Sequence, residues 1–106
     1  MSNDELDLDQ KAQLAETFGL LADATRLSIV IACMEQEIAA GDIAEKLGLS
    51  ASLTSHHLRL LRAARILRAE RRGKQVFYSM ADACVDNVLK IMINHVLHEH
   101  DGIEET

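Results

Sequence analysis

The chain has 106 residues, enough for one domain with a modest core, and a core of that size is often completed by a partner subunit. Its hydrophobic fraction is 48% but its aromatic fraction only 3%, with no Trp and no Pro, which favours aliphatic helices over a sandwich of strands and turns. Two widely spaced cysteines, no charged-then-apolar leader and no long apolar run argue against a disulfide scaffold, secretion and membrane insertion, so we expect a cytoplasmic protein.

Charge is distributed unevenly along the chain. The net charge is -6, yet the stretch from Lys46 to Lys74 holds eight basic residues against one acid, Glu70. The first sixteen residues and the segment from Ala81 onward are both acidic. Because phosphate binding depends on local rather than total charge, this pattern is compatible with a nucleic-acid surface on an otherwise acidic protein.

We predict a single domain over residues 9–99, preceded by a disordered acidic tail at 1–8 and followed by a polar tail at 100–106. The first helix starts at Asp9, where Leu14, Phe18 and Leu21 recur at helical spacing. A second helix, "ATRLSIVIACME", starts at Asp23 or Ala24; Leu27, Ile31 and Met34 share a face, with Val30 close by, and we expect the helix to be mostly buried.

Two shorter helices follow. "DIAEKLGLS" predicts a short helix that Gly48 ends in a left-handed conformation. Ser50 or Ser52 then caps a fourth helix, "SLTSHHLRLLRAAR", whose predicted buried side is Leu53, Leu58 and Leu61.

The sequence pattern changes after Arg65. "ILRAERRGKQVFYSM" alternates apolar and polar residues on both sides of Arg72-Gly73-Lys74, which predicts a two-stranded hairpin with a glycine-bearing turn. A last helix runs from about Ala81 to Glu99. The fold class is therefore mainly α with a small β-hairpin, a winged helix-turn-helix in the order α-α-α-α-β-β-α.

A short helix, a tight turn and a hydroxyl-rich second helix form the unit that places one helix in the major groove of DNA. The predicted DNA-binding residues lie on the fourth helix and at the basic hairpin tip: Ser52, Thr54, Ser55, His56, His57, Arg59, Arg71, Arg72 and Lys74. The plainer interpretation is a small helical bundle with a solvated basic face. Three features occur together: the basic stretch from Lys46 to Lys74, the hydroxyl-rich start of the fourth helix and the basic hairpin. Their coincidence favours DNA binding.

The run "LADATRLSIV … GDIAEKLGLSASLTSHHLRLLRAARILRAERRGKQVFYSM" resembles the ArsR/SmtB family of bacterial winged-helix repressors, over about residues 10–99. The resemblance implies a homodimer, formed through the first and last helices, that binds operator double-stranded DNA until an inducer, usually a metal ion, releases it. It implies no enzymatic activity, no membrane and no small organic substrate.

Possible metal ligands occur at both ends of the last helix, "SMADACVDNVLKIMINHVLHEHD". At 100° per residue Cys84, His95 and His98 fall on one stripe, but about 16 Å of helix axis separates Cys84 from His95. One metal ion therefore cannot reach both ends of the same helix. Two copies packed antiparallel across a two-fold axis would bring Asp82 and Cys84 of one subunit to His95 and His98 of the other.

This set of donors, with His100 as a possible addition, predicts two symmetric intersubunit sites per dimer. We expect Asp82 at or before the N-cap, and Val85, Val88, Met92 and Val96 as the dimer seam. In the family, sensors that use this helix resemble the chain at Asp82, His95 and His98, whereas Cys84 departs from their pattern. Zn(II) is the expected ion, with Cd(II), Co(II) or Ni(II) as alternatives. Ala39 and Ala40 stand where the family's other site has thiols, which disfavours arsenic sensing.

Each donor also has an ordinary structural explanation, as a cap, a small core residue or exposed polar surface. Two functional alternatives remain. One is a repressor that senses oxidants or persulfides through Cys33 and Cys84, although Cys33 sits in an apolar helix typical of the core. The other is a helical dimerisation module in which zinc is structural, so that the metal-free chain would be monomeric or unfolded.

Overall fold

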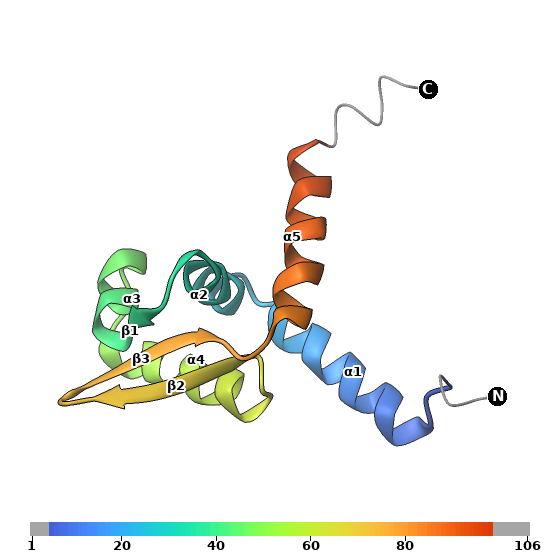
Figure 1. Ribbon diagram of the computed structural model, residues 1–106, viewed down its shortest axis with the longest axis horizontal. Helices are drawn as coiled ribbons and strands as arrows, with labels where there is room; N and C mark the ends of the chain where they lie inside the picture. Colours follow the sequence, from blue (N-terminus) through green and yellow to red (C-terminus); the bar gives the residue numbers. More distant parts are fainter. Residues whose placement is uncertain (1–4, 99–106) are drawn as a thin grey trace.

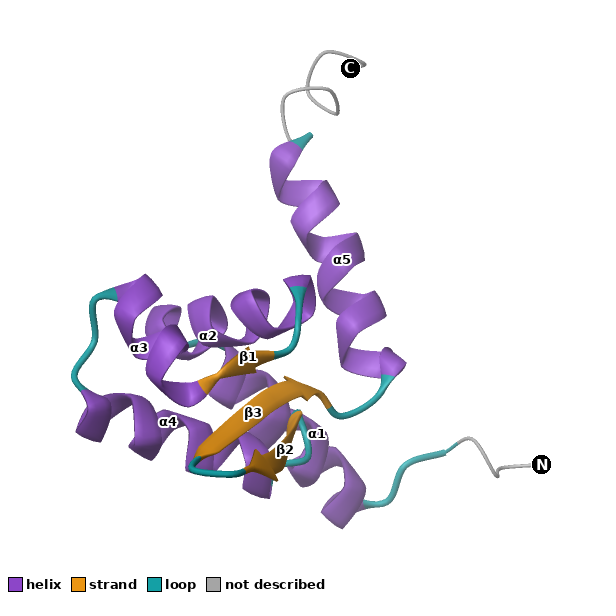
Figure 2. Ribbon diagram, turned by 60° about the vertical axis from the view of Figure 1, so that its left-hand side comes forward, coloured by secondary structure: helices purple, strands orange, loops and turns teal. Residues whose placement is uncertain are grey.

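The computed structural model describes residues 5–98 and confirms the predicted fold class (Figure 1). Its elements in chain order are α1 (Leu8–Leu21), α2 (Ala24–Glu35), β1 (Ile38–Ala39), α3 (Ala40–Leu47), α4 (Ala51–Ala63), β2 (Leu67–Arg72), β3 (Gln75–Met80) and α5 (Ala83–Leu97). Strand β1 was not expected from the sequence, because two residues are too few to show a period. It pairs antiparallel with β3, which makes a three-stranded sheet in the order β1-β3-β2 (Figure 2).

Side-chain caps fix where the helices begin. Asp7 caps α1, which begins at Leu8, one residue before the predicted start. Its carboxylate accepts a hydrogen bond from the Gln10 amide at 2.7 Å, and the Gln10 side chain accepts one from the Asp7 amide at 3.0 Å. Asp23 caps α2 by accepting from the Arg26 amide, and Ser50 caps α4 by accepting from the Leu53 amide; both are among the predicted starts. Gly48 ends α3 with a φ of 67°, the left-handed conformation that glycine adopts without strain.

The core lies where α2, α3 and α4 meet the sheet. Its buried residues are Ile29, Val30, Cys33, Ile38, Ile43, Leu58, Leu61, Ile66 and Leu67. On α2 the residues Ile29, Val30, Ala32 and Cys33 are buried, whereas Leu27, Ile31 and Met34 are half-buried. This helix is apolar on almost every side, so its periodicity does not select a face.

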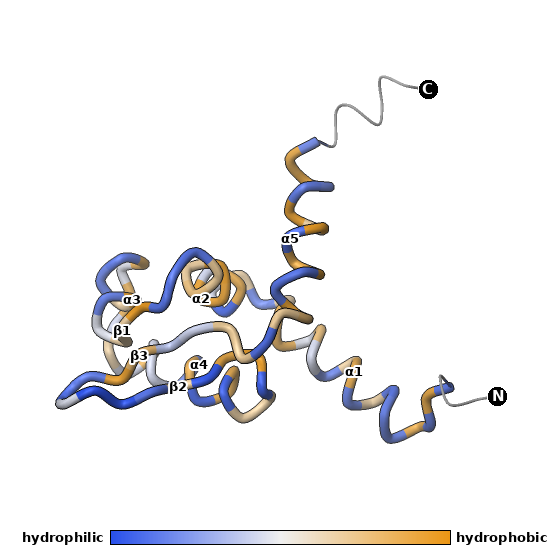
Figure 3. Tube along the Cα trace, viewed as in Figure 1, coloured by the Kyte–Doolittle hydropathy of each residue, from blue (hydrophilic) through white to orange (hydrophobic). Residues whose placement is uncertain are grey.

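Helices α1 and α5 project from this body in different directions (Figure 1). Neither contains a buried residue. Many of their large apolar side chains are instead exposed, and along α5 apolar and polar residues alternate turn by turn (Figure 3). Only the first turns of α5 reach the core, through Val85 and Leu89. The two helices thus present an apolar surface that a single subunit does not cover.

Among the described residues, no single helix is long and apolar enough to cross a bilayer; only α1 and α2 taken together pass that test, across a bend of 89°.

Candidate functional site

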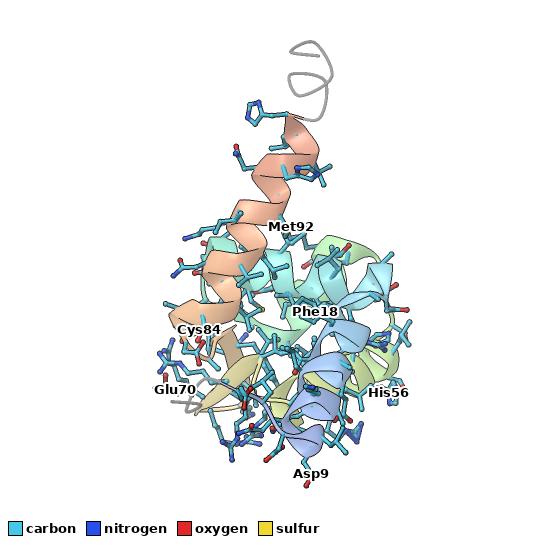
Figure 4. The ribbon with its side chains drawn as sticks, turned by 90° about the vertical axis from the view of Figure 1, so that its right-hand side faces the viewer. Asp9, Phe18, His56, Glu70, Cys84 and Met92 are labelled. Atoms are coloured by element: carbon cyan, nitrogen blue, oxygen red, sulfur yellow. The ribbon has the colours of Figure 1, made fainter. Side chains whose placement is uncertain are left out.

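Helices α3 and α4 form the predicted helix-turn-helix, and α4 exposes one side of its N-terminal half. Ser52, Ser55, His56 and Arg59 are exposed, as expected for groove-facing residues. Figure 4 shows His56 projecting outward at the edge of the molecule. The opposite side of α4 is buried in the core through Leu58 and Leu61.

Thr54 does not belong to the exposed side, so its assignment as a DNA contact was wrong. Only 1% of its surface is accessible, and its hydroxyl donates to the Ser50 carbonyl at 2.8 Å. Thr54 precedes Leu58 by four residues and therefore shares its face. Leu53 was expected in the core and is instead 42% exposed.

His57 is also an internal residue rather than a DNA contact, with 8% of its surface accessible. Its Nδ1 lies 3.4 Å from Nη1 of Arg26, whose Nε donates to the Leu20 carbonyl at 2.9 Å. Since a guanidinium only donates, Nδ1 is the accepting nitrogen of the imidazole. At the same junction the Arg26 amide, by donating to the carboxylate, lowers the pKa of Asp23. These contacts join α4 to the corner between α1 and α2.

The wing is the hairpin of β2 and β3, with its turn at Gly73 (φ 63°), as predicted. Its tip is hydrophilic (Figure 3). Arg71 and Lys74 are exposed there and make no ion pair within residues 5–98.

Arg72 differs from its neighbours because acidic side chains already hold it. Its guanidinium lies 2.8 Å from Glu37 and 3.0 Å from Glu70, and packs over the Phe77 ring at 4.7 Å. The hydrogen bond from Arg72 lowers the pKa of Glu70, and the bonds to Glu70 and Glu37 raise that of Arg72. Arg72 therefore braces the sheet, and its contact with DNA stays a prediction.

The predicted metal ligands lie along α5. Asp82 is the N-cap, as expected, and its Oδ1 accepts from the Cys84 amide at 2.9 Å. Cys84, at the base of α5 in Figure 4, is exposed, and so are His95 and His98 near the other end. In the described part of one subunit, no three potential ligands come together. His100 lies outside the described residues.

The two cysteines have opposite environments. Cys84 is exposed, whereas Cys33 is 3% exposed in the core. Burial raises the pKa of Cys33 to about 12, which leaves almost no thiolate near neutral pH. This argues against a dithiol switch.

The structure also contains a surface notch that the sequence did not indicate. A notch between α4 and the wing is lined by Ala40, Ser55, Leu58, Arg59, Arg62, Val76 and Tyr78. Arg62 was not among the expected contacts, although it follows Arg59 by three residues and Ser55 by seven, the spacing of one helix side.

Known proteins resemble the chain over the helix-turn-helix and beyond it. The family described as "Bacterial regulatory protein, arsR family" matches residues 23–69. A transcriptional repressor SmtB homolog from Synechocystis is 41% identical over 96 residues, which is 91% of this chain and 72% of that protein. A cadmium resistance transcriptional regulatory protein CadC homolog from Staphylococcus aureus is 33% identical over 89 residues, which is 83% of this chain and 71% of that protein.

Solved structures agree. The solution structure of apo-NmtR, a regulator from Mycobacterium tuberculosis, is 35% identical with a TM-score of 0.73, and the match covers 90% of this chain and 78% of that one. Family and fold are those of DNA-binding transcriptional regulators and not of enzymes. The chain therefore belongs to the ArsR/SmtB family of winged helix-turn-helix regulators.

Proposed function

We propose that this protein is a metal-responsive transcriptional repressor: a cytoplasmic homodimer that binds operator DNA without metal and releases it when Zn(II), or a similar divalent ion, binds between its α5 helices. Cd(II), Co(II) and Ni(II) are the other ions we consider. The observation that carries the proposal is the position of four exposed donors at the two ends of a helix whose apolar residues are uncovered.

DNA binding is supported by the exposed side of α4 and by the wing. Hydroxyl and imidazole groups of Ser52, Ser55 and His56 are free to meet base edges or phosphates, and Arg59 adds a cation. Arg71 and Lys74 extend the positive surface to the wing tip. The acidic residues lie mainly outside this region, so the local field favours a polyanion.

Dimerisation is supported by the large apolar side chains that α1 and α5 leave exposed. On α5 they are Val88, Ile91, Met92, Val96 and Leu97, and Ile91 is 69% exposed. On α1 they include Leu14 and Phe18. Contiguous apolar surface of this kind marks an interface. A second copy is the natural occupant, because isologous pairing covers both helices in both subunits. Val85, expected in the seam, contributes instead to its own core.

The donor set fits a zinc-like ion. Antiparallel pairing of α5 would combine the Asp82 carboxylate and Cys84 thiolate of one subunit with His95 and His98 of the partner. One oxygen, one sulfur and two nitrogens satisfy a tetrahedral Zn(II), and the thiolate also suits softer ions. Asp82 is the N-cap of α5, and this role orients its carboxylate at the start of the helix. When bound, the ion would supply a cross-link between subunits.

A route from the dimer helices to DNA is also present. Arg26 holds the C-terminal end of α1 through the Leu20 carbonyl and approaches His57 on α4. A change in how α1 packs in the dimer would therefore reach the recognition helix through one side chain. By reciprocity, DNA would weaken metal binding by the same factor as metal weakens DNA binding.

Fluorescence anisotropy of a labelled operator-like palindrome tests the proposal. Stoichiometric zinc should weaken binding, by about 5- to 150-fold if the coupling is typical. The His95→Ala variant should bind DNA normally and ignore zinc, whereas Asn94→Ala, its exposed neighbour, should respond like the wild type. Full occupancy of DNA at stoichiometric zinc would refute metal release. A metal-free protein that sediments as a monomer would favour a structural zinc instead.

A further inference from the structure

The notch between α4 and the wing combines positive charge with hydroxyl groups over an apolar floor. Its volume is about 250 Å³. Ser55, Arg59 and Arg62 come from one side of α4, within about 60° of each other on the helical wheel. Val76 and Tyr78 come from β3, and Ala40 and Leu58 complete the floor.

The two arginines of the notch are unneutralised. Within residues 5–98, the guanidinium groups of Arg59 and Arg62 make no hydrogen bond and no ion pair. Other arginines are engaged: Arg26 by the Leu20 carbonyl, Arg68 by Ser79 at 3.1 Å, and Arg72 by two glutamates. A cluster of cations without counterions is ready to accept an anion.

The register of β2 and β3 explains why no acidic side chain of the hairpin faces the notch. Arg71 pairs with Val76 and Ala69 with Tyr78, whereas Glu70 pairs with Phe77. Directly opposed residues share a face, and successive residues alternate. Arg71 therefore lies on the face of Val76 and Tyr78, toward the notch. Glu70 lies on the other face, where it binds Arg72 beside Phe77.

We propose that this notch binds a backbone phosphate of the operator, with Arg59 and Arg62 as its two cationic donors and the hydroxyls of Ser55 and Tyr78 as further partners. The inference rests on the proposed DNA binding and specifies one contact within it. A strand that runs from the major groove occupied by α4 to the minor groove beside the wing must cross the junction of these two elements. The phosphodiester at that crossing is the anion that the notch receives.

A phosphate contact carries no sequence information, so it has a distinctive signature. Loss of the Arg62 guanidinium should weaken the binding of the protein to operator and to unrelated duplexes by the same factor, about tenfold. It should also reduce the slope of log K against log salt by about one. A base contact would instead reduce discrimination between the two duplexes.

The experiment measures affinity for operator and unrelated duplexes across a salt series, by anisotropy, with full-length metal-free protein. Variants are Arg62→Gln, Arg62→Lys and Arg65→Gln. Arg65→Gln is the matched control, because Arg65 is an exposed arginine just past α4 that lines a different depression, against α1. We expect Arg62→Gln to lower the slope, Arg62→Lys to keep it and Arg65→Gln to leave it unchanged. Far-ultraviolet circular dichroism checks that each variant is folded.

Three results would overturn the inference. One is an unchanged slope in folded Arg62→Gln, and another is a selective loss of operator binding. The third is saturable binding of inorganic phosphate to the wild type that Arg62→Gln abolishes without any effect on DNA, which would make the notch a site for a free anion. Failure of the wild type to bind any duplex would instead refute the proposed function itself.

Discussion

Cys33 should be almost inert toward alkylation in the folded protein, whereas a dithiol sensor would need this thiol to react. Burial raises the pKa of this thiol from 9.0 to about 12, so its ionised fraction near neutral pH falls about a thousandfold. The greater nucleophilicity of a more basic thiolate returns a factor of about 15 to 30. Its exposure of 3% removes a factor of similar size. The net expectation is a rate about a thousandfold below that of the unfolded chain.

The Cys84→Ser variant isolates this thiol. Iodoacetamide labelling of Cys33, followed by mass spectrometry with and without urea, gives the two rates directly. A native rate within tenfold of the unfolded rate would contradict the burial argument and restore the Cys33–Cys84 redox alternative. Labelling of Cys84 in the wild type should be fast without zinc and suppressed by zinc, which serves as an internal control.

Three further predictions concern the dimer, the metal cap and pH. Met92→Glu should shift the metal-free protein from dimer to monomer in sedimentation velocity, whereas Asn94→Glu, on the opposite side of α5, should not; equal behaviour would place the interface elsewhere. Asp82→Ala should cost about 1 kcal/mol of metal-free stability through the lost cap, and Asp82→Asn much less, while both weaken zinc in a chelator competition; unchanged zinc affinity would exclude Asp82 as a ligand. The lowered pKa of Asp23 contributes stability that is present above its unfolded value, near 3.8, and is lost as pH falls through the folded value. In the Asp23→Asn variant, Tm should therefore fall less as the pH is lowered than it does in the wild type. The same fall of Tm with pH in both proteins would show that this carboxylate is not involved.

Local chemistry made much of the fold predictable. Asp23, Ser50 and Gly48 each mark a helix end through their own side chain or conformation, so they could be identified without knowledge of their neighbours. The hairpin turn at Gly73 is equally local. Strand β1 was missed because its two residues gain their structure only by pairing with β3.

The errors at the candidate site come from packing. On α4 the sequence favoured Leu53 as core and Thr54 as exposed, yet Thr54 shares the buried face of Leu58, where the Ser50 carbonyl satisfies its hydroxyl. His57 looks like a DNA-binding residue by type, but it is buried, and its partner Arg26 comes from a distant part of the chain. The metal donors were identified from their stripe on one helix. Their assembly depends on a second subunit.

Complementation between two defective subunits tests the intersubunit metal site most directly. One variant carries Asp82→Ala and Cys84→Ser, the other His95→Ala and His98→Ala, so neither homodimer holds a complete site. In a mixed dimer, the first supplies both histidines and the second supplies the carboxylate and thiolate. Mixing them should restore one Co(II) site per heterodimer, with the thiolate-to-cobalt charge-transfer absorption that neither variant shows alone. No absorption from a mixture that demonstrably contains heterodimers would contradict the antiparallel site.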